Sequence, residues 1–186
     1  MPVIPVDETL DISHVSGNAP DIIKRVAAYP SVSMFAIDGD HEKGTGYSDE
    51  IVKRMVVTEV SIVSHPEEPS KKVGRVVCEM EVHDDMVNRT RTIHGGCSAY
   101  LVDICSSIAL TALALSNGRS VDHVSQSLNM VYHSPATVGD KLRIVNTTMT
   151  MGSRTMSVRT EIWNATRHRL VASGVHIKMQ PSESKL

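Results

Sequence analysis

Aromatic side chains are scarce in this chain, which has one Trp and one Phe among 186 residues. Proteins that bind single-stranded nucleic acid stack bases on aromatic rings, so this composition disfavours that class. A concentrated positive charge is also missing, because the net charge is -2 and no long run of Lys or Arg occurs. Nucleic acids and anionic membranes attract proteins through such basic surfaces. We therefore expect no nucleic-acid partner.

Cysteines are few, widely spaced and odd in number, and they form no Cys-x-x-Cys pair or Cys/His cluster. This disfavours a zinc site and indicates reduced thiols in a cytosol-like compartment. The first ten residues contain acids and no apolar core, so they do not resemble a secretory signal. The longest apolar stretch, residues 104–115, is too short to span a bilayer. We expect neither a metal nor a membrane span.

The chain ends in Ser184, Lys185 and Leu186, a tripeptide that is a receptor-read peroxisomal address at a free C-terminus. The residues before it are polar, so a tail over 181–186 would leave the tripeptide accessible. The alternative is a chance ending. We expect a peroxisomal location in a eukaryote and a cytoplasmic one otherwise.

The chain divides into three parts by composition. Residues 1–50 contain four prolines, and residues 21–28 have a short amphipathic pattern. These features predict a loosely structured arm whose short helices pack on the domain. Residues 51–180 carry the strand and helix patterns of a single domain. The predicted strands cover about residues 55–63, 73–82, 124–132, 140–150, 155–163 and 170–179. The first two form a hairpin, and the short breaks between the last four predict an antiparallel meander.

One long helix is predicted between the second and third strands. From Cys97 to Ser116 the only charged residue is Asp103, and a helix that is apolar nearly all round must be buried on most sides. Asn117 and Gly118 end it, because both tolerate left-handed backbone. The element order predicts an α+β fold in which one curved antiparallel sheet wraps around one helix.

Asp103 is the first candidate for chemistry. An unpaired carboxylate inside an apolar helix costs several kcal/mol to bury. One interpretation is a structural acid satisfied by hydrogen bonds. The other is a general base or nucleophile in a dry cleft. Small neighbours on the same helix face, Ala99, Ser106 and Ser107, leave room for a ligand and favour the second.

The run His94-Gly95-Gly96 precedes this helix. Glycines there let a ligand approach free amide N–H groups and the positive end of the helix dipole, which suits a developing oxyanion. The alternative is an ordinary glycine-containing loop. Gly95 and Asp103 are eight residues apart, or roughly 12 Å along the helix. That distance is too long for one chain to bring both groups to one carbon, so the site needs a second subunit.

Several residues in order resemble a known family, the hotdog-fold acyl-CoA thioesterases of the acyl-CoA thioesterase 13 and phenylacetate-pathway type. They are Asn88, His94, Gly95, Gly96, Asp103, Ser125 and Ser134-Pro135-Ala136. The six-residue step from Asn88 to His94 and the nine-residue step to Asp103 match as well. The resemblance covers about residues 50–178.

This resemblance implies a hotdog fold, a homodimer or a dimer of dimers (a homotetramer), and hydrolysis of fatty or aryl acyl-CoA without a metal or other cofactor. Carried over by position, Asn88 and Gly95 would polarise the thioester carbonyl. The partner's Asp103 would attack it or activate water, Ser125 would position that water, and His94 would order the site.

Three further assignments, to Ser125, Arg154 and Lys178, each have an alternative. Ser127 and Asn129 are expected to share the strand face of Ser125, and an exposed structural serine is the alternative. Coenzyme A needs cations for its phosphates, and Arg154 and Lys178 are candidates by approximate position, with a solvated surface role as the alternative. The family often has Lys where this chain has Ser153.

Three other functions compete with hydrolysis. A hotdog hydratase or dehydratase would pair His94 with Asp103 as acid and base, but it leaves Asn88 and Ser125 without a role. A non-catalytic acyl-CoA-binding module gains nothing from a costly buried acid. A cysteine nucleophile at Cys97 or Cys105 lacks a group to orient its base.

Overall fold

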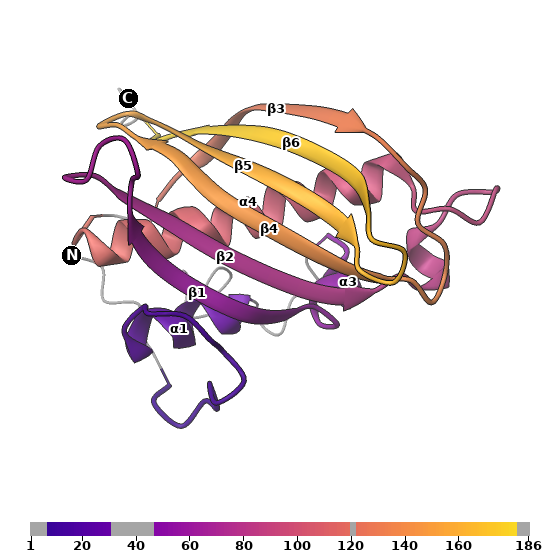
Figure 1. The fold of residues 1–186 in the computed structure, drawn as a ribbon, viewed down its shortest axis with the longest axis horizontal. Coiled ribbons are helices and arrows are strands. Elements are labelled where there is room, and N and C mark those ends of the chain that lie inside the picture. Colours follow the sequence, from indigo (N-terminus) through magenta and orange to yellow (C-terminus); the bar gives the residue numbers. More distant parts are fainter. Residues whose placement is uncertain (1–6, 31–46, 120–121, 182–186) are drawn as a thin grey trace, which may run out of the picture.

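The computed structural model describes residues 7–30, 47–119 and 122–181. A six-stranded antiparallel sheet curves around one long helix, α4 (Gly95–Ser116), as Figure 1 shows. This confirms the α+β architecture that the sequence predicted. The C-terminal tripeptide Ser184-Lys185-Leu186 lies outside the described residues.

The observed strands agree with the predicted ones within two residues at each end. They are β1 (Val56–Ser64), β2 (Lys72–Glu81), β3 (Val124–Tyr132), β4 (Lys141–Met151), β5 (Thr155–Asn164) and β6 (Arg169–Met179). The hairpin of β1 with β2 is confirmed. Buried and less buried residues alternate along β4, β5 and β6, because one face of the sheet packs on α4.

The predicted four-strand meander is wrong for β3. The sheet order is β1-β2-β4-β5-β6-β3, so β3 pairs with β6 at the far edge and not with β4. Short breaks predict neighbouring strands only when the chain turns back directly. Here the segment after β3 crosses the end of the sheet, and β4 returns to pair with β2. As a result, β3 has one edge that pairs with no strand among the described residues.

Helix α4 begins and ends as the sequence predicted. The His94 side chain accepts a hydrogen bond from the Gly96 N–H at 2.9 Å, and Gly118 adopts a φ of 63° just past the last turn. Among the described residues, α4 is the one helix long and apolar enough to cross a membrane. It is the core helix of the domain, since 72% of its apolar window is buried inside the protein.

The N-terminal arm contributes to the same core. Its helix α1 (Asp21–Ala28) matches the predicted short helix, and α3 (Asp49–Val52) follows before β1. Ile23 and Ala27 are buried in the core cluster, and Ser16 forms a parallel bridge with Glu59. The described part of the arm therefore packs on the domain.

Candidate active site

Asp103 lies on the face of α4 that is turned toward β3 and β6, and its side chain is 42% exposed. Ser125 Oγ donates to Asp103 Oδ1 at 3.4 Å. The same oxygen lies 3.6 Å from His176 Nδ1 and 3.7 Å from Lys178 Nζ. The acid thus contacts polar and basic groups of β3 and β6, and part of its side chain remains exposed.

Ser125 reaches Asp103 because of a bulge in β3. The pairing of β3 with β6 changes register between Ser125 and Ser127. Ser125 lies opposite Lys178, whereas Ser127 lies opposite Ile177, and neighbouring residues of β6 point to opposite faces of the sheet. The expectation that Ser127 and Asn129 share the face of Ser125 is therefore wrong.

Two basic side chains of β6 lie behind the acid. His176 is completely buried, and burial together with Lys178 lowers its pKa to about 4, although Asp103 opposes this. Lys178 is 6% exposed, its pKa is lowered by burial, and its ammonium donates to Ser107 Oγ at 2.6 Å. Lys178 is thus not the surface cation that we expected to meet a phosphate in this chain.

His176 was not among the site residues that the sequence predicted. A signal was present, because the inward positions of β6 run Ala172, Gly174, His176 and Lys178, and two polar residues end an otherwise small or apolar series. Such a break on a buried face indicates a polar partner on the element that covers it. Here that partner includes Asp103.

Acid should destabilise the fold through two histidines, His176 and His123. His176 and His123 both have a pKa near 4, mainly because burial disfavours the charged ring, and Lys178 lowers both further. In the unfolded chain each ring binds a proton near pH 6.5. The free energy of unfolding should therefore fall as the pH drops from about 6.5 toward 4, with a slope approaching that of two protons. Urea denaturation at several pH values measures it; His176→Gln should reduce the slope, and an unchanged slope would contradict this assignment.

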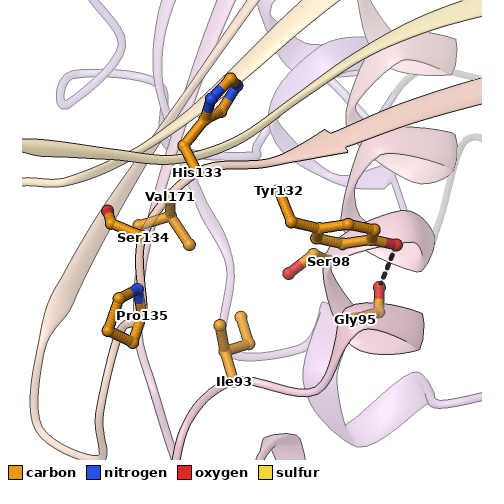
Figure 2. Close-up of a pocket in the computed structure, with 8 residues that line it drawn as sticks. All are labelled: Ile93, Gly95, Ser98, Tyr132, His133, Ser134, Pro135 and Val171. Carbon is orange, nitrogen blue, oxygen red and sulfur yellow. Dashed lines mark hydrogen bonds between the residues drawn. The ribbon is translucent and has the colours of Figure 1, made fainter.

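A pocket of about 340 Å³ lies at the other end of the site, beside the start of α4 (Figure 2). The Tyr132 hydroxyl donates to the Gly95 carbonyl at 3.1 Å across this pocket. Among the described residues, no hydrogen bond uses the Gly95 N–H. The residues that line the pocket are Ile93, Gly95, Ser98, Tyr132, His133, Ser134, Pro135 and Val171. The pocket offers a free backbone donor beside a mostly apolar wall.

The pocket includes Gly95 but not Asp103. Eight residues of helix separate the two, which is about 12 Å. One chain therefore holds two half-sites, a donor with a pocket and an acid with its polar neighbours, and does not bring them to one reacting carbon.

Asn88 and His94 lie close to the start of α4. The Asn88 Oδ1 accepts from the Thr90 and Thr92 N–H groups at 3.0 and 3.2 Å, so this side chain holds its own loop together. The Nδ2 group donates to Thr92 Oγ1 at 3.1 Å. His94 caps α4 through Nδ1, and its contact with Gly96 leaves the Gly95 N–H free.

Arg154 is exposed on the turn between β4 and β5, at the C-terminal end of α4. Arg119, just beyond that end, donates to the carbonyls of Met151 and Gly152 on the same turn. The Gly95 pocket is at the opposite end of this helix. Arg154 of one chain is therefore far from the pocket of the same chain.

The cysteines do not supply a nucleophile. Burial raises the pKa of Cys97 to about 11, and a hydrogen bond with Cys78, together with burial, raises that of Cys105 well above its usual value. Both thiols stay protonated near neutral pH, and His94 is engaged with Gly96. No group of His, Cys, Asp and Glu suited to a metal occurs in the described ranges.

Known proteins resemble this chain in sequence and fold. A family model described as the thioesterase superfamily matches residues 91–171. Acyl-coenzyme A thioesterase 13 of Homo sapiens is 34% identical over 105 residues, which cover 56% of this chain and 72% of that protein. Thioesterase superfamily member 2 of zebra fish has a TM-score of 0.60 at 27% identity, over 74% of this chain and 88% of that one. A hypothetical thioesterase from Streptococcus pneumoniae, solved with coenzyme A, has a TM-score of 0.52 at 23% identity, over 58% and 81% of the two chains. The hotdog fold is thereby confirmed.

Proposed function

Because this chain belongs to the thioesterase superfamily, within the family of acyl-coenzyme A thioesterase 13, we propose that it hydrolyses acyl-CoA thioesters to the free acid and coenzyme A. The observation that carries the mechanism is the division of one chain into two half-sites. Gly95 lines a pocket at the start of α4, and two turns along Asp103 is 42% exposed and accepts a hydrogen bond from Ser125 of β3. The solved relative from Streptococcus pneumoniae that contains coenzyme A supports coenzyme A as the thiol part of the substrate.

The reaction follows from the groups in the two half-sites. The thioester carbonyl oxygen accepts a hydrogen bond from the Gly95 N–H, and the positive end of the α4 dipole stabilises the oxyanion. The partner's Asp103 takes a proton from water as the water oxygen attacks the carbonyl carbon. The tetrahedral intermediate then collapses, the C–S bond breaks, and the leaving thiolate of coenzyme A takes the proton from Asp103, which regenerates the carboxylate. Ser125, beside Asp103, holds the attacking water.

A second copy of the chain completes the site along β3. The inner face of β3 carries Leu128 and Tyr132, which are 36% and 57% exposed, although Tyr132 contacts the start of α4. This partly apolar face adjoins the open edge of β3 and the accessible side of Asp103. Two β3 strands that pair antiparallel would bring the Asp103 of one protomer toward the Gly95 pocket of the other. Arg154 would also approach the partner's pocket, where it could meet a phosphate.

Leu128→Glu tests this interface. A glutamate on the inner face of β3 would be buried without a partner, so the dimer should weaken by about tenfold or more. Turnover should fall in parallel, since the monomer has no complete site. Analytical ultracentrifugation over a range of concentrations measures the first effect, and a steady-state assay measures the second.

Val63→Glu is the matched control, because Val63 is an exposed apolar residue on the opposite edge strand, β1, with 42% exposure. This variant should keep the dimer and the turnover. A Leu128→Glu protein that stays dimeric, or that becomes monomeric and keeps full turnover, would contradict the shared site.

Thiol release separates hydrolysis from its rivals. The hydratase scheme needs His94 as an acid or base beside Asp103, but His94 Nδ1 already accepts a hydrogen bond from the Gly96 N–H. Incubation with a panel of fatty and aryl acyl-CoA thioesters and a thiol reagent should show release of coenzyme A. Hydration of an enoyl-CoA without thiol release, or tight binding without any reaction, would refute the proposal.

A further inference from the structure

We propose that His176 is a positioning residue that aims the Ser125 hydroxyl at Asp103, an inference that rests on the proposed function. The ring lies between α4 and β3 with both nitrogens engaged. Its Nδ1 is 2.7 Å from Ser106 Oγ, and its Nε2 is 3.0 Å from Ser125 Oγ. Since the side chain is fully buried, these two contacts fix the plane of the ring.

The carboxylate decides which ring nitrogen carries the proton. At neutral pH the buried ring is neutral, so one nitrogen donates and the other accepts. If Nε2–H donates to Ser125 Oγ, the serine hydrogen is free to point at Asp103 Oδ1, which lies at 3.4 Å. In the other tautomer Ser125 donates to His176 and turns its lone pairs toward a negative oxygen. The 3.6 Å between His176 Nδ1 and Asp103 Oδ1 is too long for a hydrogen bond and does not offset that repulsion.

A directed chain of hydrogen bonds results. Ser106 donates to His176 Nδ1, in preference to the longer contact with the Asp103 carbonyl at 3.1 Å. His176 Nε2–H donates to Ser125, and Ser125 donates to the Asp103 carboxylate. Two other ionisable groups lie near the ring: Lys178, whose ammonium donates to Ser107 and lies 3.7 Å from Asp103 Oδ1, and His123.

This arrangement leaves one acceptor position on Ser125. The hydroxyl oxygen has two lone pairs, and His176 occupies one of them. The second can accept a hydrogen from water, whose other hydrogen points at the Asp103 carboxylate. His176 therefore acts through Ser125, and it needs no contact with the substrate.

A matched pair of amide substitutions tests the role. In His176→Gln the amide nitrogen reaches the place of Nε2 and can still donate to Ser125. In His176→Asn the amide stops near the place of Nδ1 and reaches only Ser106. We expect His176→Asn to lower kcat by about 10- to 100-fold with KM nearly unchanged, because the water is misplaced, while His176→Gln stays within about fivefold of the natural protein.

The same pair in a Ser125→Ala background shows whether the effect passes through Ser125. There His176→Asn should lower kcat by less than about threefold further, since the residue through which it acts is gone. Equal losses for Gln and Asn, or losses that multiply with Ser125→Ala, would overturn the inference and mark His176 as a purely structural residue. Thermal midpoints of all variants show how much each loses in stability.

A measurement without turnover separates this inference from the proposed function. The ring ¹⁵N chemical shifts of His176 in the unliganded protein report its tautomer. We expect a protonated Nε2 and a bare Nδ1, whether or not any acyl-CoA is hydrolysed. The opposite tautomer would overturn the inference even if the enzyme is active. An inactive natural protein would remove the proposed function and the role of His176 in it.

Discussion

Asp103→Asn is expected to lower kcat for acyl-CoA hydrolysis by about 10²- to 10⁴-fold while the protein stays folded. Asparagine has the shape of aspartate and can still accept the hydrogen bond from Ser125, but its amide cannot take a proton from water. The loss should appear in kcat more than in KM, since Asp103 acts on the attacking water and its role is confined to the chemical step. Steady-state kinetics with a thiol reagent, together with circular dichroism, measures both effects.

Asp85→Asn provides the matched control for charge. Asp85 is also an exposed acid paired with a basic side chain, because it accepts hydrogen bonds from Arg54 at 2.7 and 2.8 Å. Neither Asp85 nor Arg54 lines the Gly95 pocket or contacts Asp103, so turnover should be retained. If Asp103→Asn keeps turnover within a few fold of the natural protein, Asp103 is a structural acid and the mechanism is wrong.

Gly95→Pro should have the second-largest effect, a loss of about 10²- to 10³-fold in kcat, because proline removes the backbone N–H that binds the oxyanion. Proline is tolerated here, since Gly95 is the first residue of α4, where the amide has no partner within the helix. The preceding residue, His94, has φ -68° and ψ 136°, the extended conformation that proline requires before it.

Gly95→Ala keeps the N–H and is the control for the added side chain. A Cβ at this position would lie 3.4 Å from the Tyr132 ring, an ordinary van der Waals contact. We expect this variant to lose less turnover than Gly95→Pro, because it keeps the N–H, and both variants to retain the helix. Equal activity of the proline and alanine variants would show that the Gly95 amide does not stabilise the transition state.

Local patterns predicted the elements of this fold because each pattern has a local physical cause. The one charge in an apolar helix identified Asp103, and the glycines before it identified the start of α4. Turn residues placed the strand ends closely. The notable error, the position of β3, concerns pairing between segments far apart in the chain, which the short loop before β4 does not determine.

The unforeseen parts of the candidate site depend on the same long-range pairing. The bulge that turns Ser125 away from the face of Ser127 exists only once β3 lies on β6. His176 and Lys178 meet Asp103 because β6, paired with β5 on one side and β3 on the other, packs on α4. A sequence pattern can show that two polar residues interrupt a buried face, but it cannot show which acid they meet.

Mixed dimers of Asp103→Asn and Gly95→Pro test the shared site most directly. Each parent protein should be nearly inactive. When the two are unfolded together and refolded, about half of the dimers should contain one chain of each kind, and each such dimer has one site with both an intact Gly95 amide and an intact Asp103. We predict recovery of about one quarter of the natural activity. A mixture that stays as inactive as its parents, although exchange of chains is demonstrated, would contradict a site built from two subunits.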